Sequence, residues 1–162
     1  MPNPKGYSAT QIALHWLVAA LILFQLIFAD AMGSAWRAVQ RGIAPEMNPA
    51  VWAHILAGIA VLIFALWRLK LRATRGAPPA PAGSALMMNA AKWGHWALYA
   101  VMLLTPITGL VAWYGGVAEA AEVHELFKPV IILLVAGHVL AALYHHFIRK
   151  DGLLLRMRRP LD

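Results

Sequence analysis

Four long apolar segments dominate the sequence and limit the folds available to it. They cover about residues 12–29, 51–67, 97–114 and 124–148, and each approaches the roughly 20 residues that a helix needs to span a bilayer. Only 13% of the residues are charged, against roughly 25% in a soluble domain. Within lipid the backbone must satisfy its own hydrogen bonds, which single segments of this length achieve as α-helices. The sequence therefore predicts an all-α membrane protein, a bundle of four transmembrane helices.

The expected helix bounds follow from these segments and their flanks. We predict helices over about residues 9–29, 50–70, 90–114 and 124–148. Ser8 or Thr10 is suited to cap the first helix, because a hydroxyl oxygen there can accept a backbone N–H. The whole chain, residues 1–162, is expected to form one domain. Pro129 raises an alternative, since proline often begins or kinks a helix: the fourth helix would then begin at Pro129, with His124 in a preceding turn.

Basic residues gather in alternate connections between the four segments. The two tails and the second connection hold eleven of the 14 Lys and Arg residues, whereas the first and third connections hold only Arg37 and Arg41. Cytoplasmic loops carry an excess of Lys and Arg. We therefore expect both termini in the cytoplasm. The net charge of +7 is explained by this topology and by contact with membrane lipid, so nucleic acid is not an expected partner.

Four histidines stand in or at the ends of the apolar segments: His15, His54, His124 and His138. Ionisable side chains inside a membrane are costly and are usually functional. His124 and His138 are 14 residues apart, which on one helix places them about 21 Å apart along the axis and on nearly the same face. The expected topology puts His15 and His138 toward the inner side and the other two toward the outer side. The sequence thus predicts two layers, each with two imidazoles.

Two imidazoles on opposite sides of a porphyrin are a ligand set for haem in a helical bundle. The chain has no cysteine, which excludes covalent haem attachment through thioethers, iron–sulfur clusters and disulfides. We therefore predict two non-covalent haem b groups, an inner one between His15 and His138 and an outer one between His54 and His124. The alternative is a protein without redox activity, in which the histidines bind a bare metal ion or relay protons.

Further polar residues lie near the inner ends of the segments. His145 follows His138 by seven residues, so it falls on nearly the same helix face, about 10 Å closer to the cytoplasm. His95 begins the third segment at a similar depth. We expect His145 and His95 to line a polar pocket below the inner haem. A pocket of this kind suits a quinone, which needs a hydrogen-bond donor for each oxygen and a route for protons. The basic residues that would complete it are Lys92, Arg68 and Lys70. Alternatively, these side chains pair with haem propionates or lipid phosphates.

Two basic residues on the outer side have three possible roles. Arg37 and Arg41 are candidates for steering a small anion toward the outer haem. Anchoring a propionate and standing in solvent without a ligand are the other two. The sequence favours the solvated interpretation.

Several stretches around the histidines form a recognisable pattern. They are Ile12-Ala-Leu-His-Trp-Leu, Ala53-His-Ile-Leu-Ala-Gly58, Gly94-His-Trp-Ala-Leu-Tyr99, Val123-His-Glu125, Gly137-His138, His145-His-Phe147 and Lys150-Asp-Gly-Leu-Leu-Leu-Arg-Met157. In these stretches the chain resembles the bacterial cytochrome b561 family of four-helix, dihaem membrane cytochromes. The resemblance covers nearly the whole chain. It implies haem b on the four histidines, in the pairs given above, and a location in the bacterial inner membrane.

The length and layout are most similar to superoxide oxidases of that family. This similarity implies electron transfer from periplasmic superoxide to ubiquinone near the cytoplasmic face, with His145 and His95 in contact with the quinone. The alternative within the family is a quinol-dependent cytochrome that passes electrons to a periplasmic partner protein, because direction depends on haem potentials. Residues 115–123 form a shorter connection over the expected outer haem than in such an oxidase, which leaves the outer electron partner open.

Overall fold

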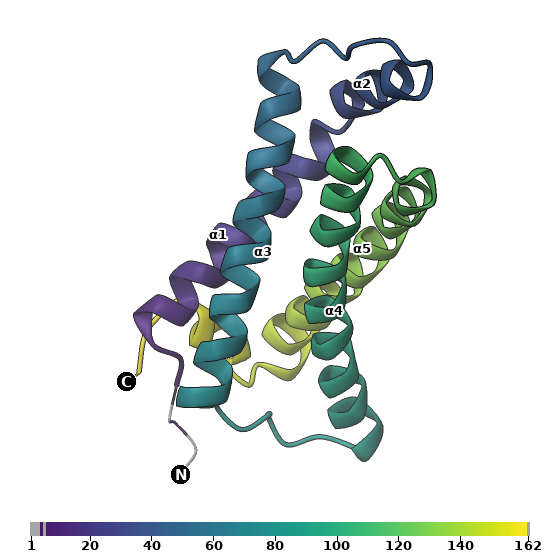
Figure 1. Cartoon of the computed structure of the whole chain (residues 1–162). Coiled ribbons are helices and arrows are strands. Elements are labelled where there is room, and N and C mark those ends of the chain that lie inside the picture. The colour runs from purple at the N-terminus through teal and green to yellow at the C-terminus, as the bar shows by residue number, and fades with distance from the viewer. Residues whose placement is uncertain (1–3, 5, 162) are drawn as a thin grey trace.

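The computed structural model describes residue 4 and residues 6–161, and these form a bundle of helices (Figure 1). The α-helices are α1 (Ala9–Ile27), α2 (Asp30–Gln40), α3 (Pro49–Arg75), α4 (Ala85–Gly115) and α5 (Ala118–Tyr144). A π-helix, η1 (His145–Arg149), and a 3-10 helix, η2 (Leu153–Met157), follow α5. Among the described residues, four helical segments are long and apolar enough to cross a membrane: α1, α3, α4 and α5 with η1. The predicted fold class of four spans is therefore confirmed.

Local sequence signals explain where three of these helices begin. The Ser8 hydroxyl accepts the backbone N–H of Gln11, and the Gln11 side chain accepts the N–H of Ser8 in return. Asn48 caps α3 with its side-chain oxygen, and Pro49 occupies the first helical position, where no backbone donor is needed. Ser84 caps α4. Of the two capping residues expected for the first helix, Ser8 is the one that serves.

Three helices extend beyond the predicted bounds, whereas α1 ends at Ile27, two residues before its predicted end. α3 continues to Arg75 instead of residue 70, and α4 begins at Ala85 instead of residue 90. α5 begins at Ala118, six residues before the predicted start, and continues through Pro129. The alternative in which the last helix begins at Pro129 is therefore wrong. The apolar segments are shorter than the helices that contain them, because the helix ends continue past the apolar region into polar residues.

The apolar pattern predicts no helix between the first two spans, yet Asp30–Gln40 form α2. Its sequence nevertheless carries a helical signal, since Met32, Trp36 and Val39 recur at helical spacing and Asp30 in the first turn complements the helix dipole. Ala35 of α2 is buried against α3. The segment is too short to span a membrane, so a search for apolar runs misses it.

The bundle is held by successive helix pairs. α1 packs on α3, α3 on α4, and α4 on α5 (Figure 1). One core lies between α1, α3 and α4 and contains Val18, Val61, Ala65, Tyr99 and Met102. A second joins α2 to α3 through Ala35, Val51 and Ile55, with Trp113 of α4 packed against it. Most other large apolar side chains face outward, as expected for helices that lie in lipid.

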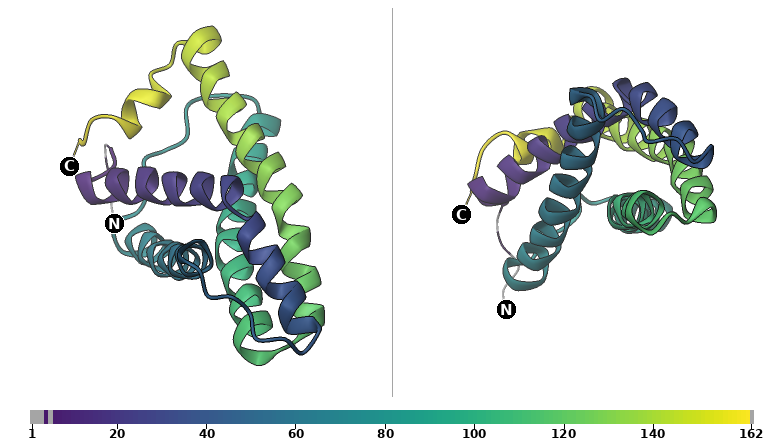
Figure 2. Two further views of the ribbon diagram at one scale, coloured as in Figure 1. Left: turned by 90° about the horizontal axis from the view of Figure 1, so that it is seen from above. Right: turned by 45° about the horizontal axis from the view of Figure 1, so that its top comes forward.

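The C-terminal tail folds back to the start of α1 (Figure 2). The indole N–H of Trp16 donates to the carbonyl of Met157 at 2.8 Å, and the backbone N–H of Leu161 donates to the carbonyl of Tyr7 at 3.3 Å. The two ends of the described chain therefore lie at the same end of the bundle. That arrangement agrees with an even number of spans. The cytoplasmic location of this end stays a prediction, and Lys5, one of the basic residues behind it, lies outside the described residues.

Candidate functional site

The predicted outer pair of histidines meets across the bundle. His54 on α3 and His124 on α5 have ring centres 6.1 Å apart. Two imidazoles on opposite sides of one metal, each with a nitrogen roughly 2 Å from it, have ring centres about 6 Å apart. The Nδ1–H of His124 donates to the carbonyl of Thr105 on α4 at 2.8 Å. That bond leaves Nε2 as the ring nitrogen available to a ligand.

A glycine makes the position of His124 possible. A Cβ atom at Gly109 would lie 2.9 Å from Cε1 and 3.0 Å from Nδ1 of the His124 ring. Real Cβ atoms essentially never approach a neighbour more closely than 3.0 Å. The ring therefore occupies space that any larger residue at Gly109 would take.

A cavity of about 590 Å³ opens between these histidines. This volume is within the range of about 300–1,000 Å³ for cofactor and ligand pockets. α2 contributes Met32, Trp36 and Arg37 to the wall, so the helix that the sequence did not reveal covers the pocket. Within the described part of the chain, Nδ1 of His54 is buried without a hydrogen-bond partner. A buried polar atom left in this way is costly, which fits a site completed by a bound group.

The predicted inner pair has the same ring spacing. His15 on α1 and His138 on α5 have ring centres 6.1 Å apart. Nη2 of Arg68 lies 3.2 Å from Nδ1 of His15. A guanidinium only donates, so Nδ1 accepts here and the proton of the neutral ring is on Nε2. Binding of a metal through Nε2 requires the proton on Nδ1 instead, and Arg68 must then release His15.

A third imidazole lies against the inner pair. The His95 ring on α4 has its centre 5.3 Å from that of His138. Its Nδ1–H donates to the carbonyl of Ala91 at 2.6 Å, one turn earlier in the helix. His95 therefore lies directly beside a predicted haem ligand. The sequence suggested a separate pocket further from the inner pair.

His145 has a different partner. Its Nδ1–H donates to Oδ2 of Asp151 at 2.5 Å, and Oδ1 of Asp151 accepts the backbone N–H of Leu153 at 3.2 Å. Sequence reasoning missed Asp151, although its place in the Lys150-Asp-Gly152 stretch was noted. Among the described residues, the His95 ring contacts the His138 ring, whereas the His145 ring contacts the Tyr144 ring.

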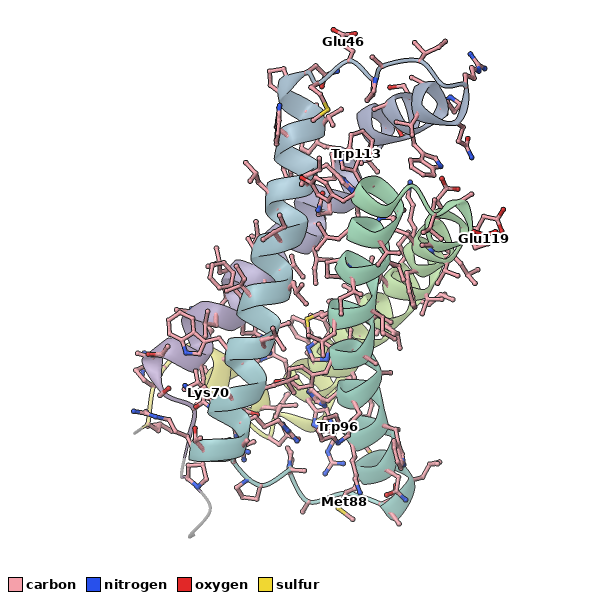
Figure 3. The ribbon with its side chains drawn as sticks, viewed as in Figure 1. Glu46, Lys70, Met88, Trp96, Trp113 and Glu119 are labelled. Carbon is pink, nitrogen blue, oxygen red and sulfur yellow. The ribbon has the colours of Figure 1, made fainter. Side chains whose placement is uncertain are left out.

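The remaining basic candidates separate into two groups. Arg68 and Arg37 contact or line the proposed sites, at the inner and outer pairs respectively. Lys70 and Arg41 are exposed, and the Lys92 ammonium lies over the Trp93 ring, 5.5 Å from its centre. Figure 3 shows Lys70 far from Trp113 and Glu119, which lie toward the other end of the bundle. Among the described residues, no hydrogen bond, ion pair or ring contact joins Lys70 or Lys92 to His95 or His145.

Some charged residues at the outer cavity were not singled out by the sequence. Its wall also includes Asp30, Glu125 and Lys128. Helical spacing alone could have placed Lys128 near His124, because it lies four residues further along α5 on the same face. Over residues 4 and 6–161, no group of three or more His, Cys, Asp or Glu side chains is arranged to hold a bare metal ion. The four central histidines are arranged as two pairs.

Comparisons with known proteins find relatives that match nearly the whole chain. Residues 6–160 match the family described as "Prokaryotic cytochrome b561". The chain is 39% identical to the "Cytochrome b562" of Cereibacter sphaeroides, over 99% of each chain. It is 30% identical to the "Probable superoxide oxidase CybB" of Yersinia pestis, over 94% of this chain and 96% of that protein. It is also 31% identical to the "Cytochrome b561 homolog 1" of Escherichia coli, over 93% and 96%.

Proposed function

Because the chain belongs to the prokaryotic cytochrome b561 family, we propose that it oxidises superoxide on one side of the bacterial inner membrane and reduces ubiquinone on the other. Family membership supports electron transfer in a membrane and a haem b cofactor. The proposal adds the number of haems, their ligands, the substrates and the orientation. The basic residues at the ends of the chain support cytoplasmic termini.

The observation that carries the proposal is the equal spacing of two histidine pairs. The ring centres are 6.1 Å apart in both, and the two ligands from α5 are 14 residues apart on one helix. His54 and His124 would hold an outer haem in the cavity under α2. His15 and His138 would hold an inner haem. Haem b, when bound, supplies reversible one-electron chemistry at its iron.

The overall reaction balances without a further reactant. Two superoxide ions and one ubiquinone take up two protons and give two oxygen molecules and one ubiquinol. The chain's own part is to bind, to guide charge and to supply protons. Arg37 at the cavity wall would attract the superoxide anion. His145 and His95 would contact the quinone through Nε2, which donates only when the ring is an imidazolium, because the Nδ1–H of each ring is already bonded.

The relative from Yersinia pestis, which is named a probable superoxide oxidase, supports superoxide as the donor. A second candidate function has its own support. The chain is more similar to a protein named only as a cytochrome b562, and a turn at residues 116–117 is all that joins α4 to α5 at the outer end. That short turn suits docking of a periplasmic protein that would receive electrons from quinol.

A direct experiment measures ubiquinone reduction by purified, haem-loaded protein while superoxide is generated. We expect reduction that depends on the protein, and a loss of about 100-fold in His145→Ala with both haems retained. His146→Ala is the matched control, because its side chain is exposed and contacts Phe147. Quinol-driven haem reduction without any response to superoxide would favour the second function. A protein loaded with haem but lacking a reducible b-type spectrum would exclude both.

A further inference from the structure

The structure gives His145 a carboxylate partner that lies in the tail beyond the last span. We propose that Asp151 is a positioning residue. It holds the His145 ring with Nδ1 protonated, so that Nε2 is the nitrogen that faces the quinone oxygen. This inference rests on the proposed quinone reduction. It deepens that function by naming the group that orients the proton donor.

The contacts of Asp151 engage both of its oxygens. Oδ2 accepts the Nδ1–H of His145 at 2.5 Å, and Oδ1 accepts the backbone N–H of Leu153 at 3.2 Å. Nε of Arg149 lies 3.6 Å from Oδ2. The side chains of Asp151 and His145 are both largely shielded, with 19% and 17% of their surface exposed. A carboxylate fixed at two points can fix the tautomer and tilt of the imidazole that it binds.

The backbone around Asp151 turns sharply, which brings the carboxylate back to the end of the helix. Lys150 and Gly152, its two neighbours, both have positive φ, at 52° and 73°. A positive φ is uncommon for a residue other than glycine, so Lys150 adopts it as part of a specific turn. His145 itself begins the π-helix η1, and π-helical turns occur frequently at functional sites.

The linker between α3 and α4 supports this turn from the other side. Nη2 of Arg149 donates to the carbonyl of Ala82 at 2.5 Å, and Nη1 of Arg156 donates to the carbonyl of Pro79 at 2.7 Å. These two bonds tie the tail to the linker on both sides of Asp151. The position of the carboxylate is therefore set by three chain segments: the tail, the linker and the end of α5.

The charge of Asp151 suits the proposed role. Its pKa is lowered, first by the hydrogen bond from His145, and further by the backbone N–H of Leu153 and the charge of Arg149. The side chain is therefore a carboxylate at neutral pH. A carboxylate on Nδ1 stabilises the imidazolium form of the ring, as the buried aspartate does in serine protease triads.

The proton step then has a defined path. The imidazolium gives its Nε2 proton to a quinone oxygen and becomes neutral, while Nδ1–H stays on Asp151. Water on the cytoplasmic side returns a proton to Nε2 when the quinol leaves. Two such transfers, with the two electrons of the proposed reaction, convert one quinone to one quinol. Without Asp151 the neutral ring is free to carry its proton on either nitrogen.

The test is a double-mutant cycle in the haem-loaded protein, with ubiquinone reduction as the measured rate. We expect Asp151→Asn to lower kcat by about tenfold. Losing the hydrogen-bond partner of a functional histidine typically lowers activity by about 10- to 100-fold, and this expectation is at the lower end. Asp151→Glu should restore part of the rate. In the His145→Ala background, Asp151→Asn should change the rate by less than about twofold, because it acts only through His145.

Two controls separate this role from a structural one. Glu119→Gln removes the same charge from an exposed residue near the opposite end of the bundle (Figure 3) and should leave the rate unchanged. Nitrogen-15 spectra of labelled histidine should show the His145 ring protonated at Nδ1 in the parent protein and mixed tautomers in Asp151→Ala. This second measurement needs neither quinone nor turnover.

The possible failures are distinguishable. Full activity in Asp151→Asn together with slow turnover in His145→Ala would overturn this inference and leave the quinone site in place. An equal loss from Asp151→Asn in both backgrounds would also overturn it, because Asp151 would then act independently of His145. Full quinone reduction by His145→Ala would instead contradict the proposed quinone site itself, whatever the ring spectra show.

Discussion

The outer and inner histidine pairs have the same spacing but different surroundings. Both have ring centres 6.1 Å apart. The outer ring of His124 is fixed by a backbone carbonyl and a glycine, beside a mainly apolar cavity closed by α2. The inner pair has the His95 imidazole and the Arg68 guanidinium in contact with it. One helical frame thus provides two similar ligand pairs, and the polar groups around the inner pair suit it to chemistry that consumes protons.

The largest expected effect separates the two pairs completely. We predict that His54→Ala removes the outer haem and retains the inner one, and that His138→Ala does the reverse, because each pair is formed by different residues. The haem-to-protein ratio, measured from the pyridine haemochrome spectrum, should fall from two to one in each variant. A folded His54→Ala protein that still holds two haems would contradict the ligand assignment.

A smaller change should affect the outer pair alone. Gly109→Ala places a Cβ atom against the His124 ring, so we expect outer-haem affinity to fall by about 10- to 100-fold, as when the support of a metal ligand is disturbed. Gly94→Ala on the same helix is the matched control, because a Cβ there meets nothing within 4 Å. Haem titration of the haem-depleted proteins provides the measurement. Equal outer-haem affinities in the two variants would show that Gly109 has no such role.

The inner pair should respond to the loss of one nearby cation. Arg68→Ala should lower the midpoint potential of the inner haem by on the order of tens of millivolts, because a positive charge favours the reduced iron. Lys70→Ala on the same helix should change it much less, since Lys70 is exposed and screened by solvent. A redox titration followed by absorbance distinguishes them. Equal shifts in the two variants would remove the special position given to Arg68.

The weakest effect concerns the approach of an anion to the outer cavity. Arg37→Ala should slow the reaction with superoxide about two- to threefold at low ionic strength, and the difference should shrink as salt is added. Arg41→Ala should have a smaller effect, because Arg37 lines the cavity and Arg41 does not. The same loss in both variants would indicate that only net charge matters.

The sequence predicted the spans well, because lipid imposes one simple requirement on every apolar segment. It did not predict α2, because that helix is too short to span a membrane and packs through Ala35 against α3, a contact that apolar length does not reveal. The distance between His15 and His138 depends on how α1 and α5 are placed relative to each other, and no sequence pattern gives such a distance. Asp151 was missed for a related reason. Its contact with His145 depends on a turn with two positive φ angles.

The proposed direction of electron flow is tested most directly by rapid mixing of the oxidised, haem-loaded and quinone-free protein with superoxide. Absorbance in the b-type haem band reports reduction as it occurs. The proposal predicts fast reduction that stays fast in His145→Ala and is lost in His54→Ala. Haems that stay oxidised in the presence of superoxide, but are reduced by ubiquinol, would contradict it and leave the quinol-dependent function in its place.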